Sequence, residues 1–326
     1  MEQLVRSCYK KKSGYAFAKK AEDIAREYGI ERIARLASNE NPEPLSPDSQ
    51  EAARQALLTV NRYPDERVNI LVNALRKYYG DYHFVTGVGM DGVIETVIRT
   101  LVDPGEKVAI STPTFSFYAL AAMGQGANVI TVHREMDFSV EPKTLIEAAH
   151  DAKVTVLCSP NNPTGNASSP DTVREILEGI EGVLFLDNAY VEFSDYDYLP
   201  LMNKYENLII GRTFSKVYSL AGLRIGYAFT PRWLPPWYNT ASTPFAVNSV
   251  SAAAAAAALK DILHADRYIA QVQLWRRRFA SAVKYPVLPS DANFVMVDVA
   301  PHRGDDMVEA LARKGVLVRS CRSFSG

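Results

Sequence analysis

The sequence TFSKVYSLAGLRIGY, residues 213–227, carries a lysine, several hydroxyl side chains and an arginine between two apolar runs. These runs are NLIIGR, residues 207–212, and RIGYAF, residues 224–229. The connection between them is too short for the crossover helix that two parallel strands would need. The second run, Arg224–Phe229, is therefore predicted to be an antiparallel strand in a sheet that also contains the first.

Upstream of this stretch, short apolar runs rich in β-branched residues alternate with helical stretches. This alternation is typical of a parallel sheet with helices on both faces, so we expect an α/β fold with a mostly parallel sheet. The predicted strands are Lys107–Thr112, Ala127–Val132, Val154–Ser159 and Gly182–Asp187. The predicted helices are Ala21–Gly29, Ser46–Val60, Val68–Tyr79 and 91–102.

The proline-containing segment Arg232–Trp237 interrupts the alternation and predicts a domain boundary. We expect residues 1–45 to form an N-terminal arm and strap that partly joins the small domain. Residues 46–236 would form the large domain, and residues 237–326 a small α+β domain. In the small domain the pattern predicts helices at Ser251–His264, Tyr268–Lys284 and 305–314, and strands at Asn293–Val299 and Gly315–Ser320.

The composition is that of an ordinary globular protein, because 47% of the 326 residues are hydrophobic and 22% are charged. The net charge of −1 predicts no binding to nucleic acid or to an anionic membrane. Cys8, Cys158 and Cys321 are widely spaced, which predicts free thiols in a reducing compartment and no metal site. The charged segment Met1–Lys12 lacks the apolar core of a signal peptide, so we expect a cytoplasmic protein.

Lys216 follows a predicted strand, at the edge where open α/β sheets bind ligands. Its amine could form an imine with the aldehyde of a cofactor. The hydroxyl groups of Thr213 and Ser215, together with Arg224, could hold a phosphate group. A single lysine after a strand is more often only solvated, but the cluster favours a cofactor site.

Two further motifs lie at the C-terminal ends of predicted strands. Asp187 needs a partner if it is buried, and a protonated pyridine nitrogen would suit it; a helix N-cap is the open alternative. Such a partner would make the ring an electron sink. Tyr190 could reach the phenolic oxygen of the same ring, and Asn162 in SPNNPTG, residues 159–165, could donate a hydrogen bond to it. The SPNNPTG motif is also a tight turn.

In combination these motifs resemble the fold-type I enzymes that use pyridoxal 5′-phosphate (PLP), and most closely the histidinol-phosphate aminotransferase family. The resemblance runs from about Tyr15 to Arg319. It includes LASNENP (36–42), NRYPD (61–65), TGVGMDGVIE (86–95), PTFSFY (113–118), LDNAYVEF (186–193) and SDANFVMV (290–297). It implies a seven-stranded sheet, a homodimer with shared active sites, and interconversion of L-histidinol phosphate and 2-oxoglutarate with imidazole-acetol phosphate and glutamate, in histidine biosynthesis.

The resemblance also implies roles for individual residues. The catalytic residues would be Lys216, as Schiff-base lysine and proton shuttle, Asp187, which faces the pyridine nitrogen, and Tyr190. The cofactor would also contact Asn162, Thr213, Ser215, Arg224, Gly89, Met90, Asp91, a stacking Phe115 and the neighbouring subunit's Tyr63. Substrate contacts would be Tyr15, Asn39 and Arg319. The chain departs from the family pattern at Phe17, Ala18 and Pro44, and the family's second substrate arginine would lie beyond Gly326.

The same cofactor residues would serve other reactions, because the site and not the fold fixes the chemistry. The alternatives within the fold are transamination of aromatic amino acids and decarboxylation of a phosphorylated amino acid. An alternative of another class is a non-catalytic PLP-binding regulatory module. The absence of a helix-turn-helix or basic extension before the domain makes this last alternative the least expected.

Overall fold

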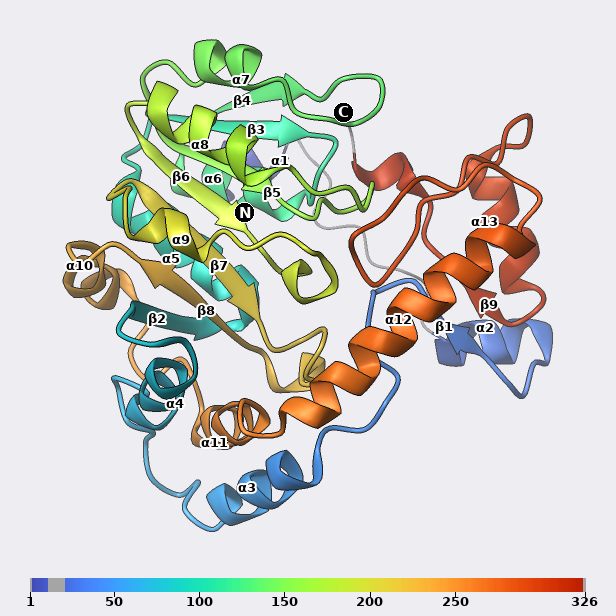
Figure 1. Cartoon of the computed structure of the whole chain (residues 1–326), viewed down its shortest axis with the longest axis horizontal. Helices are drawn as coiled ribbons and strands as arrows, with labels where there is room; N and C mark the ends of the chain where they lie inside the picture. The colour runs from blue at the N-terminus through green and yellow to red at the C-terminus, as the bar shows by residue number, and fades with distance from the viewer. Residues whose placement is uncertain (1, 11–20, 325–326) are drawn as a thin grey trace.

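The computed structural model describes residues 2–10 and 21–324, and its centre is a seven-stranded sheet in the order β2-β8-β7-β6-β5-β3-β4 (Figure 1). The strands are β2 (His83–Val88), β3 (Lys107–Thr112), β4 (Asn128–His133), β5 (Ala152–Cys158), β6 (Val183–Asp187), β7 (Leu208–Thr213) and β8 (Ile225–Thr230). Only β8 runs antiparallel to its neighbours β2 and β7. The expected α/β fold and the antiparallel strand are both confirmed.

The central strands are apolar on both faces because helices cover both sides of the sheet. In β6, Leu184 and Leu186 join the core cluster that includes Val173 and Ile176 of α8 (Pro170–Gly179). Phe185 points the other way, into the cluster that contains the buried residues of α5 (Gly89–Leu101). This period of two explains the continuous apolar runs in the sequence.

The remaining long helices are α2 (Ala21–Tyr28), α3 (Pro47–Leu57), α4 (Asn69–Tyr79), α6 (Phe117–Gln125), α7 (Pro142–Ala148), α10 (Leu234–Ala241), α11 (Ser249–Ala258), α12 (Ile262–Ala282) and α13 (Gly304–Ala312). Of these, α2, α3, α4 and α13 lie close to predicted positions, whereas no helix was predicted at the positions of α6, α7 and α10. Shorter ones are α1 (Ser7–Lys10) and α9 (Leu199–Met202). The Ser46 side chain accepts a hydrogen bond from the Ser49 backbone at the start of α3, as an N-cap does. None of the helices in the described ranges is both long and apolar enough to cross a membrane.

The second half of the chain differs from the prediction in two places. Residues 293–299 form no strand: their pairing is limited to an isolated bridge between Val287 and Val297 and the backbone hydrogen bonds beside it, and Ser290 closes a tight turn before it by donating a hydrogen bond to the Phe294 carbonyl. The predicted helix Ser251–His264 is two helices, because the Asp261 side chain caps a new helix by accepting from the His264 backbone.

Helix α2 lies beside α13, away from the large sheet, and its Ile24 packs with Ala312 (Figure 1). There β1 (Ala34–Arg35) pairs in parallel with β9 (Val316–Leu317), which is shorter than the strand predicted at Gly315–Ser320. The division at residue 236 stays a prediction. Two helices that follow this position still pack against the predicted large domain. Helix α10 contacts α5 and β2, and α11 contacts α3 and α4.

Candidate active site

The three chemical motifs meet at one edge of the sheet. The carboxyl ends of β5, β6 and β7 lie side by side, because Cys158 pairs with Asp187, and Asp187 pairs with Gly211. Asn162 follows β5, Tyr190 follows β6 and Lys216 follows β7. Ligands of open α/β sheets bind at this edge, so the register alone gathers the candidate residues where a ligand is expected.

Asp187 is a buried carboxylate with two protein donors. Its side chain is 3% exposed, its Oδ2 accepts a hydrogen bond of 2.7 Å from the Tyr118 hydroxyl, and its Oδ1 accepts one of 2.9 Å from the Ala189 backbone. Burial raises the pKa of Asp187 to about 6, while the two hydrogen bonds act in the opposite direction. The short helical turn after the strand has Tyr190 at its N-cap, so Asp187 is not the cap that was the alternative.

Lys216 is held against the strap, which is the irregular segment at residues 36–45 of the N-terminal arm. Its Nζ donates a hydrogen bond of 3.1 Å to the Ser38 carbonyl and lies 5.6 Å from the centre of the Tyr190 ring. Burial lowers the pKa of Lys216 to about 8, although the nearby carboxylates of Glu40 and Asp91 raise it. An appreciable share of the amine is therefore unprotonated near neutral pH, which is the form that attacks a carbonyl carbon.

An anion cradle lies beside these two residues. Helix α5 begins at Gly89 without any side-chain cap, so its first backbone N–H groups remain available to an anion. A Cβ atom on Gly89 would lie 2.6 Å from Arg224 Nη2, which shows how closely the guanidinium covers the helix start. The same Nη2 is 2.7 Å from Asp91 Oδ2. The Thr213 hydroxyl donates to Ser215 Oγ over 3.0 Å, which adds two hydroxyl groups.

Tyr190 connects the strap to the sheet edge. The Asn39 side-chain amide donates a hydrogen bond of 3.2 Å to the Tyr190 hydroxyl, and the Asn293 amide donates to the Asn39 carbonyl over 3.0 Å. The Tyr190 ring also packs edge-on against Phe294, with 5.1 Å between ring centres. Among the described residues, no hydrogen-bond partner is found for the side-chain amide of Asn162, so it is available to a ligand at this edge.

For some predicted residues the structure shows contacts only with residues outside this cluster. Tyr63 is 82% exposed and stacks on Phe245, with 4.8 Å between ring centres. The Arg319 guanidinium stacks over Phe324 at 4.7 Å. Tyr15 lies outside the described residues. Phe115 and Met90 lie closer: the Phe115 ring meets the Tyr118 ring edge-on at 5.5 Å, and Met90 packs under β7, where a Cβ on Gly211 would meet its sulfur at 2.8 Å.

Three groups that contact the cluster were not predicted from the sequence. They are the Tyr118 hydroxyl, the Asn293 amide and the Ser38 carbonyl. Tyr118 and Asn293 lie within motifs quoted above, PTFSFY and SDANFVMV, so their positions were visible but their partners were not. The Ser38 carbonyl is a backbone group, so the identity of the side chain at this position does not predict its contact with Lys216.

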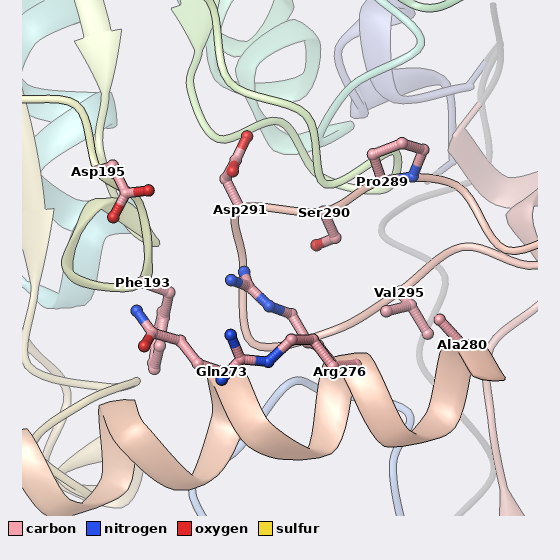
Figure 2. Close-up of a pocket in the computed structure, with 10 residues that line it drawn as sticks. Phe193, Asp195, Gln273, Arg276, Ala280, Pro289, Ser290, Asp291 and Val295 are labelled. Atoms are coloured by element: carbon pink, nitrogen blue, oxygen red, sulfur yellow. The ribbon is translucent and has the colours of Figure 1, made fainter. Parts of the chain in front are cut away.

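A cavity of about 410 Å³ lies elsewhere, between α12 and the loop at residues 289–295 (Figure 2). Its walls include Arg276 on the helix, and Asp195 and Asp291 on the facing loops. Arg276 Nη1 donates a hydrogen bond of 2.9 Å to the Ala292 carbonyl, which links the helix to that loop. Neither Lys216 nor Asp187 lines this cavity, so it is separate from the cluster at the sheet edge.

Residues 31–325 match the model of the family described as aminotransferase class I and II. The chain therefore belongs to the class I and II aminotransferases, which are enzymes. Its similarity to proteins named histidinol-phosphate aminotransferase places it in that family within the class. It is 62% identical to the one from Methanoculleus marisnigri, over 100% of this chain and 93% of the relative. It is 56% identical to the one from Methanocorpusculum labreanum, over 97% of this chain and 90% of the relative.

Solved structures agree with this assignment. The chain superposes with a TM-score of 0.88 and 26% identity on histidinol-phosphate aminotransferase from Sinorhizobium meliloti in complex with pyridoxal 5′-phosphate, covering 97% of this chain and 89% of that one. An aspartate aminotransferase double mutant from Thermus thermophilus has a TM-score of 0.79 at 19% identity, covering 98% of this chain and 92% of that one, which supports the fold alone.

The residues present at the sheet edge fit this cofactor. PLP has an aldehyde, a pyridine nitrogen that can be protonated, and a phosphate. The chain offers an amine with a lowered pKa at Lys216, a buried carboxylate at Asp187, and an anion cradle around the uncapped start of α5. Each functional group of the cofactor thus has a group of matching chemistry on the chain.

The raised pKa of Asp187 predicts how the cofactor-free chain responds to pH. Its pKa is about 6 when folded against 3.8 as the reference value, so folding favours the neutral acid. The stability that this preference gives is present below about pH 4 and is lost as the pH rises through 6. Asp187→Asn should therefore raise the free energy of unfolding at pH 8 by up to about 3 kcal/mol, since (6 − 3.8) × 1.36 is about 3.

Urea unfolding of the cofactor-free chain at pH 4, 6 and 8 measures this effect. The gain from Asp187→Asn should shrink towards zero at pH 4, whereas Asp195→Asn, an exposed carboxylate, should change little at any pH. Equal gains at pH 4 and pH 8 would contradict the account of Asp187 as a carboxylate that is costly to ionise.

Proposed function

We propose that this chain catalyses the PLP-dependent transfer of an amino group between L-histidinol phosphate and 2-oxoglutarate, which yields imidazole-acetol phosphate and glutamate. The observation that carries the proposal is the meeting of Lys216 and the buried Asp187 at one sheet edge, beside an anion cradle. The choice of substrate is supported by 62% identity to a protein named histidinol-phosphate aminotransferase. The reaction would be a step of histidine biosynthesis, carried out in the cytoplasm.

The bound cofactor supplies an electron sink for the charge that develops at the substrate's Cα. Lys216 would provide the nucleophilic amine that holds the cofactor, and as a free amine it would take the proton from the substrate's Cα as a general base and deliver it, as a general acid, to the carbon that carried the cofactor's aldehyde. Its lowered pKa, about 8, suits both tasks near neutral pH because both forms of the amine are populated. The hydrogen bond to the Ser38 carbonyl holds the amine at the sheet edge until a ligand replaces it.

Asp187 and its neighbours orient the cofactor ring. The ionised carboxylate of Asp187 keeps a ring nitrogen protonated, because an unpaired charge in a buried position is costly. The Tyr190 hydroxyl and the Asn162 amide serve the ring oxygen as hydrogen-bond donors. Phe115 provides an aromatic face for stacking, and its contact with the Tyr118 ring supports its position.

The phosphate is held by the cradle. Arg224 supplies a guanidinium, Thr213 and Ser215 supply hydroxyl groups, and the backbone of Gly89, Met90 and Asp91 supplies N–H groups at the start of α5. Asp91 fixes the guanidinium through its 2.7 Å contact with Nη2. A dianion at this position is stabilised by a cation and by the positive end of a helix.

For the substrate, we assign contacts to Asn39, Arg319 and Tyr15. Asn39 lies in the strap and already donates a hydrogen bond to Tyr190, which supports a place beside the reacting atoms. Arg319 is a cation near the end of the chain that suits an anionic substrate group. Tyr15 is assigned by the family resemblance alone.

The working form would be a homodimer with shared active sites. Tyr63 and Phe245 stack on each other at the surface, and both are exposed. Other exposed apolar side chains that belong to the same stretch of chain are Leu57, Leu58, Val60 and Ile70. Exposed apolar groups in such number favour a protein partner. In the dimer, Tyr63 would reach the cofactor phosphate of the other subunit.

A coupled assay tests the proposed reaction. Wild-type chain loaded with PLP should convert histidinol phosphate and 2-oxoglutarate to imidazole-acetol phosphate and glutamate. Lys216→Ala should lower kcat by about 100- to 10,000-fold or more, because a general base usually contributes a factor in this range. Lys260→Ala, at an exposed lysine, should retain full activity. Aromatic amino acids and a phosphorylated amino acid, the latter with carbon dioxide release as readout, test the other reactions. Turnover of one of these but not of histidinol phosphate would refute the assignment.

Cofactor binding by Arg224→Gln tests the phosphate cradle. Loss of charge-assisted hydrogen bonds should weaken PLP binding by about 10- to 100-fold, because each is worth about 1.5–3 kcal/mol. Binding of pyridoxal, which lacks the phosphate, should not change. Equilibrium dialysis with both compounds measures the two affinities, and an equal loss for pyridoxal would contradict the role of Arg224. Arg232→Gln, at an exposed arginine, is the matched control.

A further inference from the structure

Tyr118 makes a buried hydrogen bond to the carboxylate on which the cofactor site depends. The residue lies in the first turn of α6 and is 1% exposed, and its hydroxyl donates to Asp187 Oδ2 over 2.7 Å. The two residues are 69 positions apart in the chain, so the contact joins two different elements, a helix and the end of β6. Tyr118 belongs to the core cluster on that face of the sheet.

The surroundings keep this hydroxyl protonated, so it can donate to the carboxylate, and the Cys158 side chain lies beside it. Burial and the nearby Asp187 charge raise the pKa of Tyr118 well above its ordinary value, so the phenol keeps its proton. On β5, burial raises the pKa of Cys158 to about 12, so its thiol is also neutral. The groups that act electrostatically on Asp187 itself are Asp91 on α5 and Lys216 after β7.

Arg134 is a second buried cation in this region, and it contacts the backbone of β5. Arg134 Nη2 donates a hydrogen bond of 3.2 Å to the Cys158 carbonyl, and within the described chain no ion pair is found for this guanidinium. Asp187 therefore has no arginine partner among the residues that contact it. Its two carboxylate oxygens each accept one protein hydrogen bond, from Tyr118 and from the Ala189 backbone, and each oxygen has a further lone pair for a ligand.

We propose that Tyr118 is a positioning residue that fixes the orientation of the Asp187 carboxylate and keeps it ionised at neutral pH despite its burial. The inference rests on the proposed function, because the ionised carboxylate matters through the ring nitrogen that it would face. A hydrogen bond to the charged form favours that form and opposes desolvation. Of the two donors, the Ala189 backbone is fixed by the chain, so Tyr118 is the one that a substitution can remove.

Tyr118→Phe removes the donor and leaves the ring in place. The expected result is PLP binding weakened by roughly 10- to 100-fold at pH 7, the range for one hydrogen bond to a charged group. The pH below which affinity is lost should move upward by about one unit or more, because Asp187 then takes up its proton at higher pH. Equilibrium dialysis from pH 5.5 to 9 measures both effects.

Tyr238→Phe is the matched control. Tyr238 is a fully buried tyrosine of the same core cluster, and its hydroxyl donates to the Thr86 carbonyl over 3.1 Å, away from Asp187. This variant should leave the pH dependence of PLP binding unchanged. If Tyr118→Phe and Tyr238→Phe give the same profile as the wild-type chain, the proposal is overturned. Should Tyr118→Phe not fold, Tyr118→Met removes the same donor, and the same upward shift is expected.

An infrared titration of the cofactor-free chain separates this proposal from the proposed function. The carboxyl band of Asp187, identified by its loss in Asp187→Asn, should titrate at higher pH in Tyr118→Phe than in the wild-type chain or in Tyr238→Phe. An unshifted band overturns the role of Tyr118, whatever the chain binds. A shifted band in a chain that binds no PLP would support the role of Tyr118 towards Asp187 and refute the cofactor assignment instead.

Discussion

The burial of one carboxylate at the end of β6 is the constraint on which the site depends. Asp187 is enclosed by the sheet, by α6 and by the core on one face, so ionising it in the empty chain works against its desolvation. The protein compensates only in part, with a phenol and a backbone N–H. A carboxylate left in this condition binds strongly to a protonated ring nitrogen, because that partner supplies the missing positive charge. Stability of the empty chain and affinity for the cofactor are therefore opposed at this one residue.

Lys216 shows the complementary effect at the same edge. Burial disfavours its charged form, as it does that of Asp187, so the amine becomes a better nucleophile while the carboxylate becomes a weaker acid. Titratable groups whose pKa values are displaced by burial and by nearby charges tend to cluster at functional sites. The register of β5, β6 and β7 brings both groups to one place, and the strap closes over them through Ser38 and Asn39. The anion cradle at α5 then fixes the other end of the ligand.

The sequence predicted the elements whose pattern is local. Strands β5, β6 and β7 are continuous apolar runs because both faces are covered, and the short link to β8 fixes its direction. β2 was not predicted, because Thr86 and Gly87 interrupt its apolar pattern and its pairing depends on β8. The strand predicted at Asn293–Val299 was wrong because a side chain, Ser290, closes a turn there. At the site, Lys216 and Asp187 could be found because their residue types and positions after strands are unusual. Tyr118 and the Ser38 carbonyl could not, because their roles depend on contacts between distant segments.

The most direct measurement on this site identifies the lysine that bonds to the cofactor. The chain loaded with PLP is reduced with borohydride, digested with trypsin and analysed by mass spectrometry. The cofactor's mass is expected on the peptide Thr213–Arg224, in which trypsin does not cut after Lys216 because that side chain is modified. The label should disappear in Lys216→Ala. A label on another lysine, or on none while the cofactor stays bound, would contradict the assignment of Lys216 as the lysine that bonds to PLP.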